Sequence, residues 1–145
     1  MTGTIAHILE QLAVLLEYPE EDLLLSAERC RDAFREDSEN AAKLVEFCDY
    51  VASASHDGRE EGYTRTFDFH PPHCLDVGYQ LFGESYKRGA FLAKVKAAVD
   101  CHEVSFKGQL PDHLSVVLRL LPRLDFENAR SLADEAVLPA LAKIL

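Results

Sequence analysis

Hydrophobic residues recur at helical spacing along most of the chain. In the first segment they fall at i, i+3, i+4, i+7, i+8 and i+11, which places them on one stripe of a helix. These residues are Ile5, Ile8, Leu9, Leu12, Ala13 and Leu16. We expect Thr4 to cap this helix and Tyr18-Pro19 to end it, because proline disfavours helical backbone in the residue before it.

The same spacing predicts two further helices in the first third of the chain. The second begins at Pro19-Glu20-Glu21-Asp22, since proline tolerates the first helical position and carboxylates suit the positive end of the helix dipole. Its stripe is Leu23, Ala27, Cys30 and Phe34. The third opens at Ser38, with the stripe Ala41, Leu44, Val45, Cys48 and Val51. It is expected to fray over residues 53–58, where Asp57-Gly58 is typical of a turn.

The middle of the chain is interrupted more often. Tyr63 to Phe69 is predicted to be a short helix or turn, and His70-Pro71-Pro72-His73 a rigid, non-helical connector. Residues 74–82 predict a short helix that Gly83 ends. Ser85 is expected to cap the next helix, whose stripe is Phe91, Leu92, Val95, Ala98, Val99 and His102.

The last third predicts two more helical segments after a loop at Lys107-Gly108. One opens at Pro111-Asp112, carries Leu114, Val117, Leu118 and Leu121, and is interrupted by Pro122. The other carries Phe126, Ala129, Leu132, Ala133 and Ala136, and Pro139 is expected to break or kink it. We find no convincing strand pattern. The sequence therefore predicts an all-α fold, a single-domain bundle of about seven or eight short helices over residues 1–145.

The apolar segment at the C-terminal end must pack against something. Two interpretations stay open: it docks on this domain, or the chain is a shortened version of a longer one.

Composition and charge narrow the class of protein. The chain has 145 residues, and 48% of them are hydrophobic. This is enough for one hydrophobic core without stabilising disulfides or a structural metal ion. Its net charge of −10 argues against nucleic-acid and membrane-surface binding and favours basic partners. Four widely spaced cysteines and the absence of a leader-like or membrane-spanning run lead us to expect a cytoplasmic protein without membrane insertion.

Metal binding and enzymatic catalysis are the alternatives that the residues leave open. His70, His73, Cys74 and the pair Cys101-His102 offer imidazole and thiolate, the ligands that zinc prefers. They lack the paired half-sites of a structural zinc site, and cysteines at stripe positions are commonly core residues. A helical metal-binding or redox-sensing domain is therefore the second hypothesis. No nucleophile–base pair and no phosphate-binding loop supports an enzyme.

At two corners between predicted helices, residues that end or cap a helix stand beside charged side chains. In the first, Gly83 ends a helix and Ser85 begins another, while Glu84, Tyr86 and Arg88 stand together beside them. In the second, Asp112 is expected to cap the helix that follows, and as an exposed anion it could also grip a cationic side chain.

The segment before these corners is rich in aromatic side chains, namely Tyr63, Phe67, Phe69, Tyr79, Phe82 and Tyr86. Most are expected in the core, although a subset would suit a half-wet groove for an amphipathic peptide.

Three ordered motifs give the chain a family resemblance. They are Leu15-Leu16-Glu17-Tyr18-Pro19, Gly83-Glu84-Ser85 with Arg88-Gly89, and Leu110-Pro111-Asp112-His113-Leu114. Their order and separation, with Thr66-Phe67-Asp68 between the first two, resemble the NarJ-like branch of the redox-enzyme maturation chaperones, the NarJ/TorD/DmsD family. Within it, the nitrate reductase assembly chaperones are the nearest match. Phe82 and Tyr86 depart from the family's His and Arg in the middle motif.

This resemblance implies a cytoplasmic, non-enzymatic, all-α chaperone for a molybdoenzyme of nitrate respiration or assimilation. Such a chaperone binds the basic N-terminal segment of the catalytic subunit and holds the apo-subunit for molybdenum cofactor insertion. The client carries the molybdopterin cofactor and iron–sulfur clusters, and the chaperone, a monomer or homodimer, holds no stable cofactor. By position, the implied peptide-binding residues are Asp112, His113, Glu84, Arg88, Tyr86, Tyr63 and Phe67.

Overall fold

The computed structural model describes residues 3–145, and within them all regular structure is helical. The α-helices are α1 (Gly3–Leu15), α2 (Leu23–Ala33), α3 (Ser38–Ser53), α4 (His56–Tyr63), α5 (Val77–Phe82), α6 (Tyr86–Cys101), α7 (Leu114–Leu120), α8 (Phe126–Leu132) and α9 (Leu138–Ile144). Two π-helical turns, η1 (Thr64–Asp68) and η4 (Ala133–Val137), and two 3-10 turns, η2 (Pro71–His73) and η3 (Leu121–Arg123), extend or link them. The all-α prediction is confirmed.

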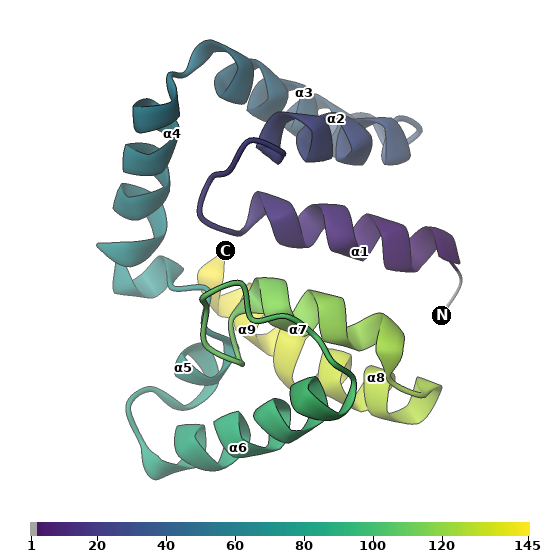
Figure 1. Ribbon diagram of the computed structural model, residues 1–145, viewed down its shortest axis with the longest axis vertical. Coiled ribbons are helices and arrows are strands. Elements are labelled where there is room, and N and C mark those ends of the chain that lie inside the picture. Colours follow the sequence, from purple (N-terminus) through teal and green to yellow (C-terminus); the bar gives the residue numbers. More distant parts are fainter. Residues whose placement is uncertain (1–2) are drawn as a thin grey trace.

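The helices stack in tiers (Figure 1). Helix α2 packs on both α3 and α1, α1 packs on α7, and α6 contacts α7 in the lower tier, where α5 packs on α6 and α9. Helix α4 runs down one edge and connects the upper tier to the lower one.

Helix α7 forms the centre of the core because five of its seven residues are leucine or valine. Every residue from Leu114 to Leu120 is buried, and Val116 and Val117 have no exposed surface. A helix that is hydrophobic all round must be covered by neighbours on every face. Arg119 is the single charged residue in this helix.

Several predicted helix ends are confirmed. Helix α3 begins at Ser38, with the preceding Asp37 accepting a hydrogen bond from the Asn40 N–H at 3.2 Å. Gly83 ends α5 with φ of +62°, a backbone conformation that glycine adopts without the usual Cβ clash. Helix α6 follows Ser85, although the Ser85 hydroxyl makes no capping bond.

Other predicted boundaries are wrong. Asp57-Gly58 is not a turn, because Ser55 accepts a hydrogen bond from the Gly58 N–H at 3.0 Å and so starts α4 ahead of that pair. Helix α2 begins at Leu23, beyond the predicted Pro19–Asp22 start. Thr4 lies inside α1, whose first described residue is Gly3.

The prolines also behave differently from the prediction. Pro71–His73 forms one 3-10 turn, which fits the fixed φ of proline. Ahead of Pro139 the chain widens into η4 and continues directly as α9, so the helix adjusts its hydrogen-bond pattern without breaking.

Three predicted stripe residues, Ile5, Val45 and Phe126, are exposed. Within residues 3–145, no helix combines the length and apolar character needed to cross a bilayer.

Candidate functional site

A cavity of about 490 Å³ opens between the end of α1, the start of α2, the C-terminal half of α3 and the α4–η1 segment. We call it the apolar groove. Most of its lining is aliphatic or aromatic: Leu15, Pro19, Leu23, Phe47, Tyr50, Tyr63 and Phe67. Its remaining lining residues are Glu17, Arg59, Gly62, Arg65 and Thr66. The cavity therefore has the apolar body with few polar groups that is typical of ligand sites.

Helical periodicity on α4 and η1 decides which side chains face the groove. Arg59, Gly62, Tyr63 and Thr66 are spaced i, i+3, i+4 and i+7, and all four line it. Gly62 leaves room for the Tyr50 ring, because a Cβ added at Gly62 would collide with the Tyr50 hydroxyl. A side chain at position 62 would therefore displace the Tyr50 hydroxyl from this wall.

Tyr63 anchors this wall to the end of α1. Its hydroxyl donates a hydrogen bond to the Leu16 carbonyl oxygen at 2.9 Å. Its ring lies edge-on to Tyr18, with 5.6 Å between ring centroids, and 5.0 Å from the Phe67 ring. Burial raises the pKa of the Tyr63 hydroxyl, so Tyr63 stays neutral. Tyr63 and Phe67 are therefore placed in a groove wall, as the aromatic pattern predicted for a subset of these residues.

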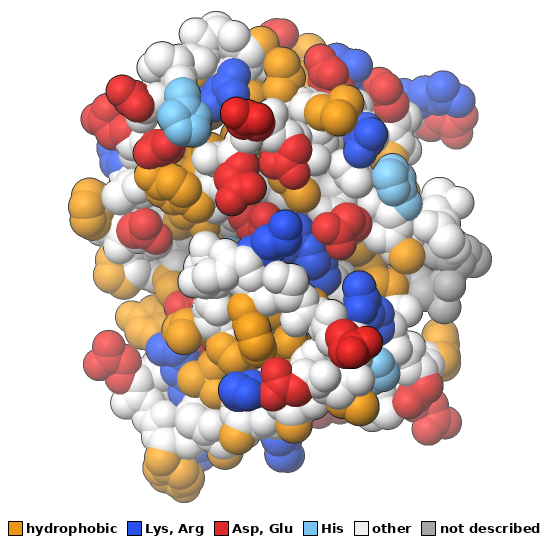
Figure 2. Space-filling view, in the orientation of Figure 1, with side chains coloured by type: hydrophobic (Ala, Val, Ile, Leu, Met, Phe, Trp, Pro, Cys, Tyr) orange, Lys and Arg blue, Asp and Glu red, His pale blue; other side chains and the backbone are white. Residues whose placement is uncertain are grey.

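Acidic side chains surround the outer edge of α4 and the connection between α1 and α2. We call these the acidic rim: Glu20, Glu21, Asp22, Asp57, Glu60 and Glu61. They line two shallow hollows that share Tyr18 and Glu60, and these hollows adjoin the apolar groove at Pro19 and Arg65. Figure 2 shows red side chains gathered over the upper left of this face, where Figure 1 has α4 and the α1–α2 connection.

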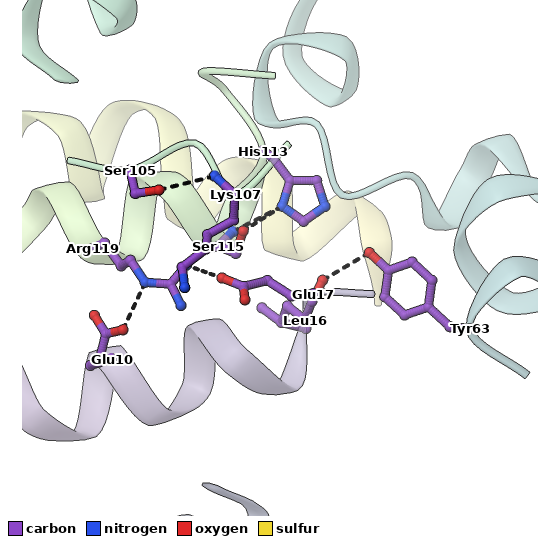
Figure 3. A network of polar contacts seen from close by, with 9 residues as sticks. All are labelled: Glu10, Leu16, Glu17, Tyr63, Ser105, Lys107, His113, Ser115 and Arg119. Atoms are coloured by element: carbon purple, nitrogen blue, oxygen red, sulfur yellow. Dashed lines mark hydrogen bonds and ion pairs between the residues drawn. The ribbon is translucent and has the colours of Figure 1, made fainter. Parts of the chain in front are cut away.

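An ion-pair network holds the α1 side of the groove on the core (Figure 3). Arg119 of α7 is buried, and its Nε donates to Glu10 Oε1 at 2.8 Å. The same guanidinium pairs with Glu17, which lines the groove. Because both carboxylates follow or belong to α1, Arg119 fastens that helix and the start of the α1–α2 connection to α7.

Asp112 lies inside the protein and not on a groove edge. It has no exposed surface, and its Oδ2 accepts a hydrogen bond from the Gly78 N–H at 2.9 Å and lies 3.5 Å from Arg88 Nε. Burial raises the pKa of this carboxyl, with Asp76 adding to the effect and Arg88 opposing it. Two backbone hydrogen bonds bring the segments together, Val77 N to the Asp112 carbonyl and Leu114 N to the Leu75 carbonyl, both at 2.8 Å.

The expected capping role of Asp112 is therefore corrected. Its carboxylate binds the second residue of α5, whereas His113 is the N-cap of α7. His113 Nδ1 accepts from the Ser115 N–H at 3.2 Å and lies 2.8 Å from the Ser115 hydroxyl. Burial lowers the pKa of His113 to about 4, so the ring is neutral at pH 7.

The other predicted site residues lie at the corner between α5 and α6. Glu84 and Tyr86 are exposed there, and Arg88 reaches inward to Asp76 and Asp112. None of these three, and neither Asp112 nor His113, lines the apolar groove. Asp112 and Glu84, two of the implied peptide-binding residues, thus lie away from the apolar groove, because the corner and the groove belong to different tiers of the bundle.

The candidate metal ligands do not converge. Within residues 3–145, no three His, Cys, Asp or Glu side chains are grouped so that they could hold a metal ion. The His70 and His73 rings stack 4.7 Å apart, and the Cys74 thiol lies 3.5 Å from Asp76. Cys101 is an exposed thiol at the end of α6. The alternative metal-binding hypothesis thus lacks a geometric basis in the described part of the chain.

Comparison with a known protein supports the resemblance to NarJ-like chaperones. Over 127 residues the chain is 28% identical to the probable nitrate reductase molybdenum cofactor assembly chaperone NarJ of Bacillus subtilis (strain 168). The match covers 86% of this chain and 69% of that relative. The chain is NarJ-like. No protein-family model matches it. The resemblance predicted from the three ordered motifs is confirmed, and two of them have roles in the structure: Glu17 and Pro19 line the groove, and Asp112 and His113 join α5 to α7.

Sequence reasoning missed Arg119, Glu17 and Arg59 as important residues. For Arg119 a signal was present, because an arginine within an otherwise apolar helix must find a buried partner. Glu17 and Arg59 carried no such signal, since charged residues in polar surroundings are usually exposed.

Proposed function

We propose that this chain is a system-specific chaperone for a molybdoenzyme related to nitrate reductase. It binds the N-terminal segment of the catalytic subunit and holds the apo-subunit for molybdenum cofactor insertion and assembly. The similarity to NarJ over 86% of the chain carries this proposal. In this role the chain is not an enzyme, and the molybdopterin cofactor and iron–sulfur clusters belong to the client.

The apolar groove supports binding of an amphipathic helix. A peptide helix presents apolar side chains at i, i+3, i+4 and i+7, and such a stripe fits a groove lined by aliphatic and aromatic residues. A cavity of about 490 Å³ has room for a few anchoring side chains, while the rest of the helix stays at the surface. Tyr63 and Phe67 contact the peptide directly in this proposal.

The acidic rim supports a basic partner. Six carboxylates stand beside the groove, and the whole chain carries a net charge of −10. A positively charged N-terminal segment is attracted to such a surface before contact and is oriented by it on arrival. In this proposal Asp112 and His113 stabilise the α5–α7 junction. Peptide contacts of Glu84, Tyr86 and Arg88 stay predictions.

Coexpression with the client tests the proposed function. The chain is tagged and coexpressed with the nitrate reductase-like catalytic subunit encoded in the same genome, in full length and without roughly its first 20 residues, which is several helical turns. We expect the full-length subunit to copurify and the truncated one to be lost. Equal recovery of both would show that the N-terminal segment is not the binding element.

A charge-neutralised variant tests the rim. Glu20 and Glu21 are exposed, and within residues 3–145 neither side chain has a hydrogen-bond or ion-pair partner. The Glu20→Gln/Glu21→Gln variant should weaken binding of the subunit by roughly threefold to tenfold. The matched control is Glu103→Gln/Glu127→Gln, which removes the same charge from exposed positions outside the rim and should leave binding within about twofold. An equal loss in both variants would exclude the rim as a specific contact.

A further inference from the structure

Arg59 lines the groove and has a buried hydrogen-bond donor without an acceptor. It lies on α4, lines the apolar groove and is half-buried. Its Nε is inaccessible to solvent and has no hydrogen-bond partner. Buried donors in folded proteins are satisfied almost without exception, because an unmet donor loses its water without gaining a new acceptor.

The other arginines have an acceptor nearby or are exposed to water. Arg31, Arg65, Arg88, Arg119 and Arg130 each lie within ion-pair distance of a carboxylate, and Arg123 donates to the His102 carbonyl oxygen. The Nε of Arg88 is also buried without a hydrogen bond, but it lies 3.5 Å from Asp112 Oδ2. Arg29 and Arg35 have no such partner in the described part of the chain, but both are exposed to water. Arg59 alone combines partial burial with the lack of an internal acceptor in residues 3–145.

We propose that Arg59 binds an oxygen acceptor on the peptide that occupies the groove. This inference rests on the proposed function and specifies the chemistry of that site. The guanidinium is planar, permanently charged and able to donate several hydrogen bonds, so it suits a carboxylate or a set of free backbone carbonyls.

The arrangement also gives the peptide a direction. Arg59 faces the groove, whereas the rim residues Asp57, Glu60 and Glu61 line a neighbouring hollow, and α4 contributes to both. A helix has a positive N-terminal end and free carbonyls at its C-terminal end. The peptide therefore places its basic N-terminal end against the acidic rim and its C-terminal carbonyls, or an acidic side chain near them, against Arg59.

Binding measurements on matched variants test this inference. The probe is a synthetic peptide that copies roughly the first 20 residues of the nitrate reductase-like catalytic subunit encoded in the same genome. Its Kd is measured with the wild-type chain, Arg59→Met, Arg59→Lys and the control Arg35→Met. Arg35 is exposed and does not line the groove, so this control removes one arginine charge outside the proposed binding site.

We expect Arg59→Met to raise Kd by about tenfold or more, Arg59→Lys to recover part of that loss, and Arg35→Met to change Kd by less than about threefold. A second peptide, with its Asp and Glu residues replaced by Asn and Gln, separates the two acceptors. If its affinity for the wild type falls to that of Arg59→Met, the acceptor is a carboxylate; if its affinity is retained and still depends on Arg59, the acceptor is the backbone.

The Nε–H resonance of Arg59 in ¹⁵N spectra provides a direct readout, assigned by its absence in Arg59→Lys. It should shift when the peptide is added, because the proton gains an acceptor. Thermal unfolding should show equal or higher Tm for Arg59→Met, since no internal contact of the guanidinium is lost. Tight binding by wild type and Arg59→Met alike, with an unmoved resonance, would overturn the inference and leave the proposed function standing. A peptide that fails to bind the wild type would overturn both.

Discussion

Single side chains at the α5–α7 junction join segments that are distant in sequence. Asp112 accepts the Gly78 N–H across 34 positions of chain and lies beside Arg88, which also reaches Asp76. Next to it, His113 caps α7 with its ring nitrogen and is almost fully buried. Both side chains accept hydrogen bonds from backbone N–H groups. Replacing either residue should therefore disturb the α5–α7 junction more than it changes the protein surface.

His113 should make the protein acid-sensitive between pH 6.5 and 4. Its pKa is lowered from 6.5 to about 4 by burial, so below pH 6.5 the unfolded chain binds a proton that the folded chain rejects. The contribution of neutral His113 to the free energy of unfolding is fully present above pH 6.5. It is lost as the pH falls to 4, and the total loss is about 3 kcal/mol. Urea unfolding of wild type and His113→Asn across this range checks it. Asparagine keeps a capping acceptor but does not titrate, so its stability should fall less steeply; parallel curves would contradict the assignment.

Gly78 should not tolerate a methyl group. A Cβ there would lie 2.6 Å from Asp112 Oδ2 and 3.0 Å from the Phe91 ring, inside the packed junction. We expect Gly78→Ala to lower the free energy of unfolding by about 2–3 kcal/mol.

The matched control is Gly89→Ala on α6, where nothing lies within 4 Å of the added Cβ. Alanine there should stabilise the helix by up to ~1 kcal/mol. Denaturant midpoints compare the two variants, and a harmless Gly78→Ala would mean that the junction is loosely packed.

At the scale of elements, the groove is a product of three connections. Tyr63 ties α4 to the Leu16 carbonyl, Arg119 ties α7 to α1, and the Ser55 cap starts α4 in the register that turns Arg59 and Tyr63 toward the cavity. Because α1 packs against both α2 and α7, its position sets the groove wall and the core together.

Removing Arg119 should therefore destabilise the whole bundle. Arg119→Met leaves Glu17, which is mostly buried, without its counter-charge, and we expect a loss of about 3 kcal/mol in the free energy of unfolding. Glu10 is half exposed, so Glu10→Gln should cost no more than ~1 kcal/mol. Chemical denaturation of both variants measures the difference, and similar small losses would show that the network contributes little.

The whole molecule combines a high negative charge with an apolar cavity, and the two properties act at different ranges. Charge works over a distance of about 10 Å at 0.1 M salt, whereas apolar contact requires that surfaces touch. A basic amphipathic peptide would use both, the first for approach and the second for retention.

Binding of such a peptide should accordingly weaken with salt without being abolished. Raising NaCl from about 0.05 to 0.5 M should raise Kd several-fold for the wild type. The Glu20→Gln/Glu21→Gln variant should show a shallower salt dependence, while Phe47→Ala should bind more weakly at every salt concentration with the same slope. Fluorescence anisotropy of a labelled peptide provides the measurement, and a salt-independent Kd would exclude the rim from binding.

The sequence by itself determined the helical class, most helix positions and the resemblance to NarJ. Periodicity, caps and prolines act through neighbours about four residues away, and the start of α3 at Ser38 and the end of α5 at Gly83 follow from such local signals. Where local signals competed, as with the Ser55 cap and the Asp57-Gly58 pair, the wrong one was favoured.

Only the tertiary structure decided which residues face the groove. Arg119 and Glu17 meet across 102 positions, and Tyr63 reaches Leu16 across 47. No local pattern encodes pairings of this kind, since they depend on how whole helices pack. For the same reason Asp112, predicted at a surface, lies in the interior, while the acidic residues beside the groove come from α4 and the α1–α2 connection.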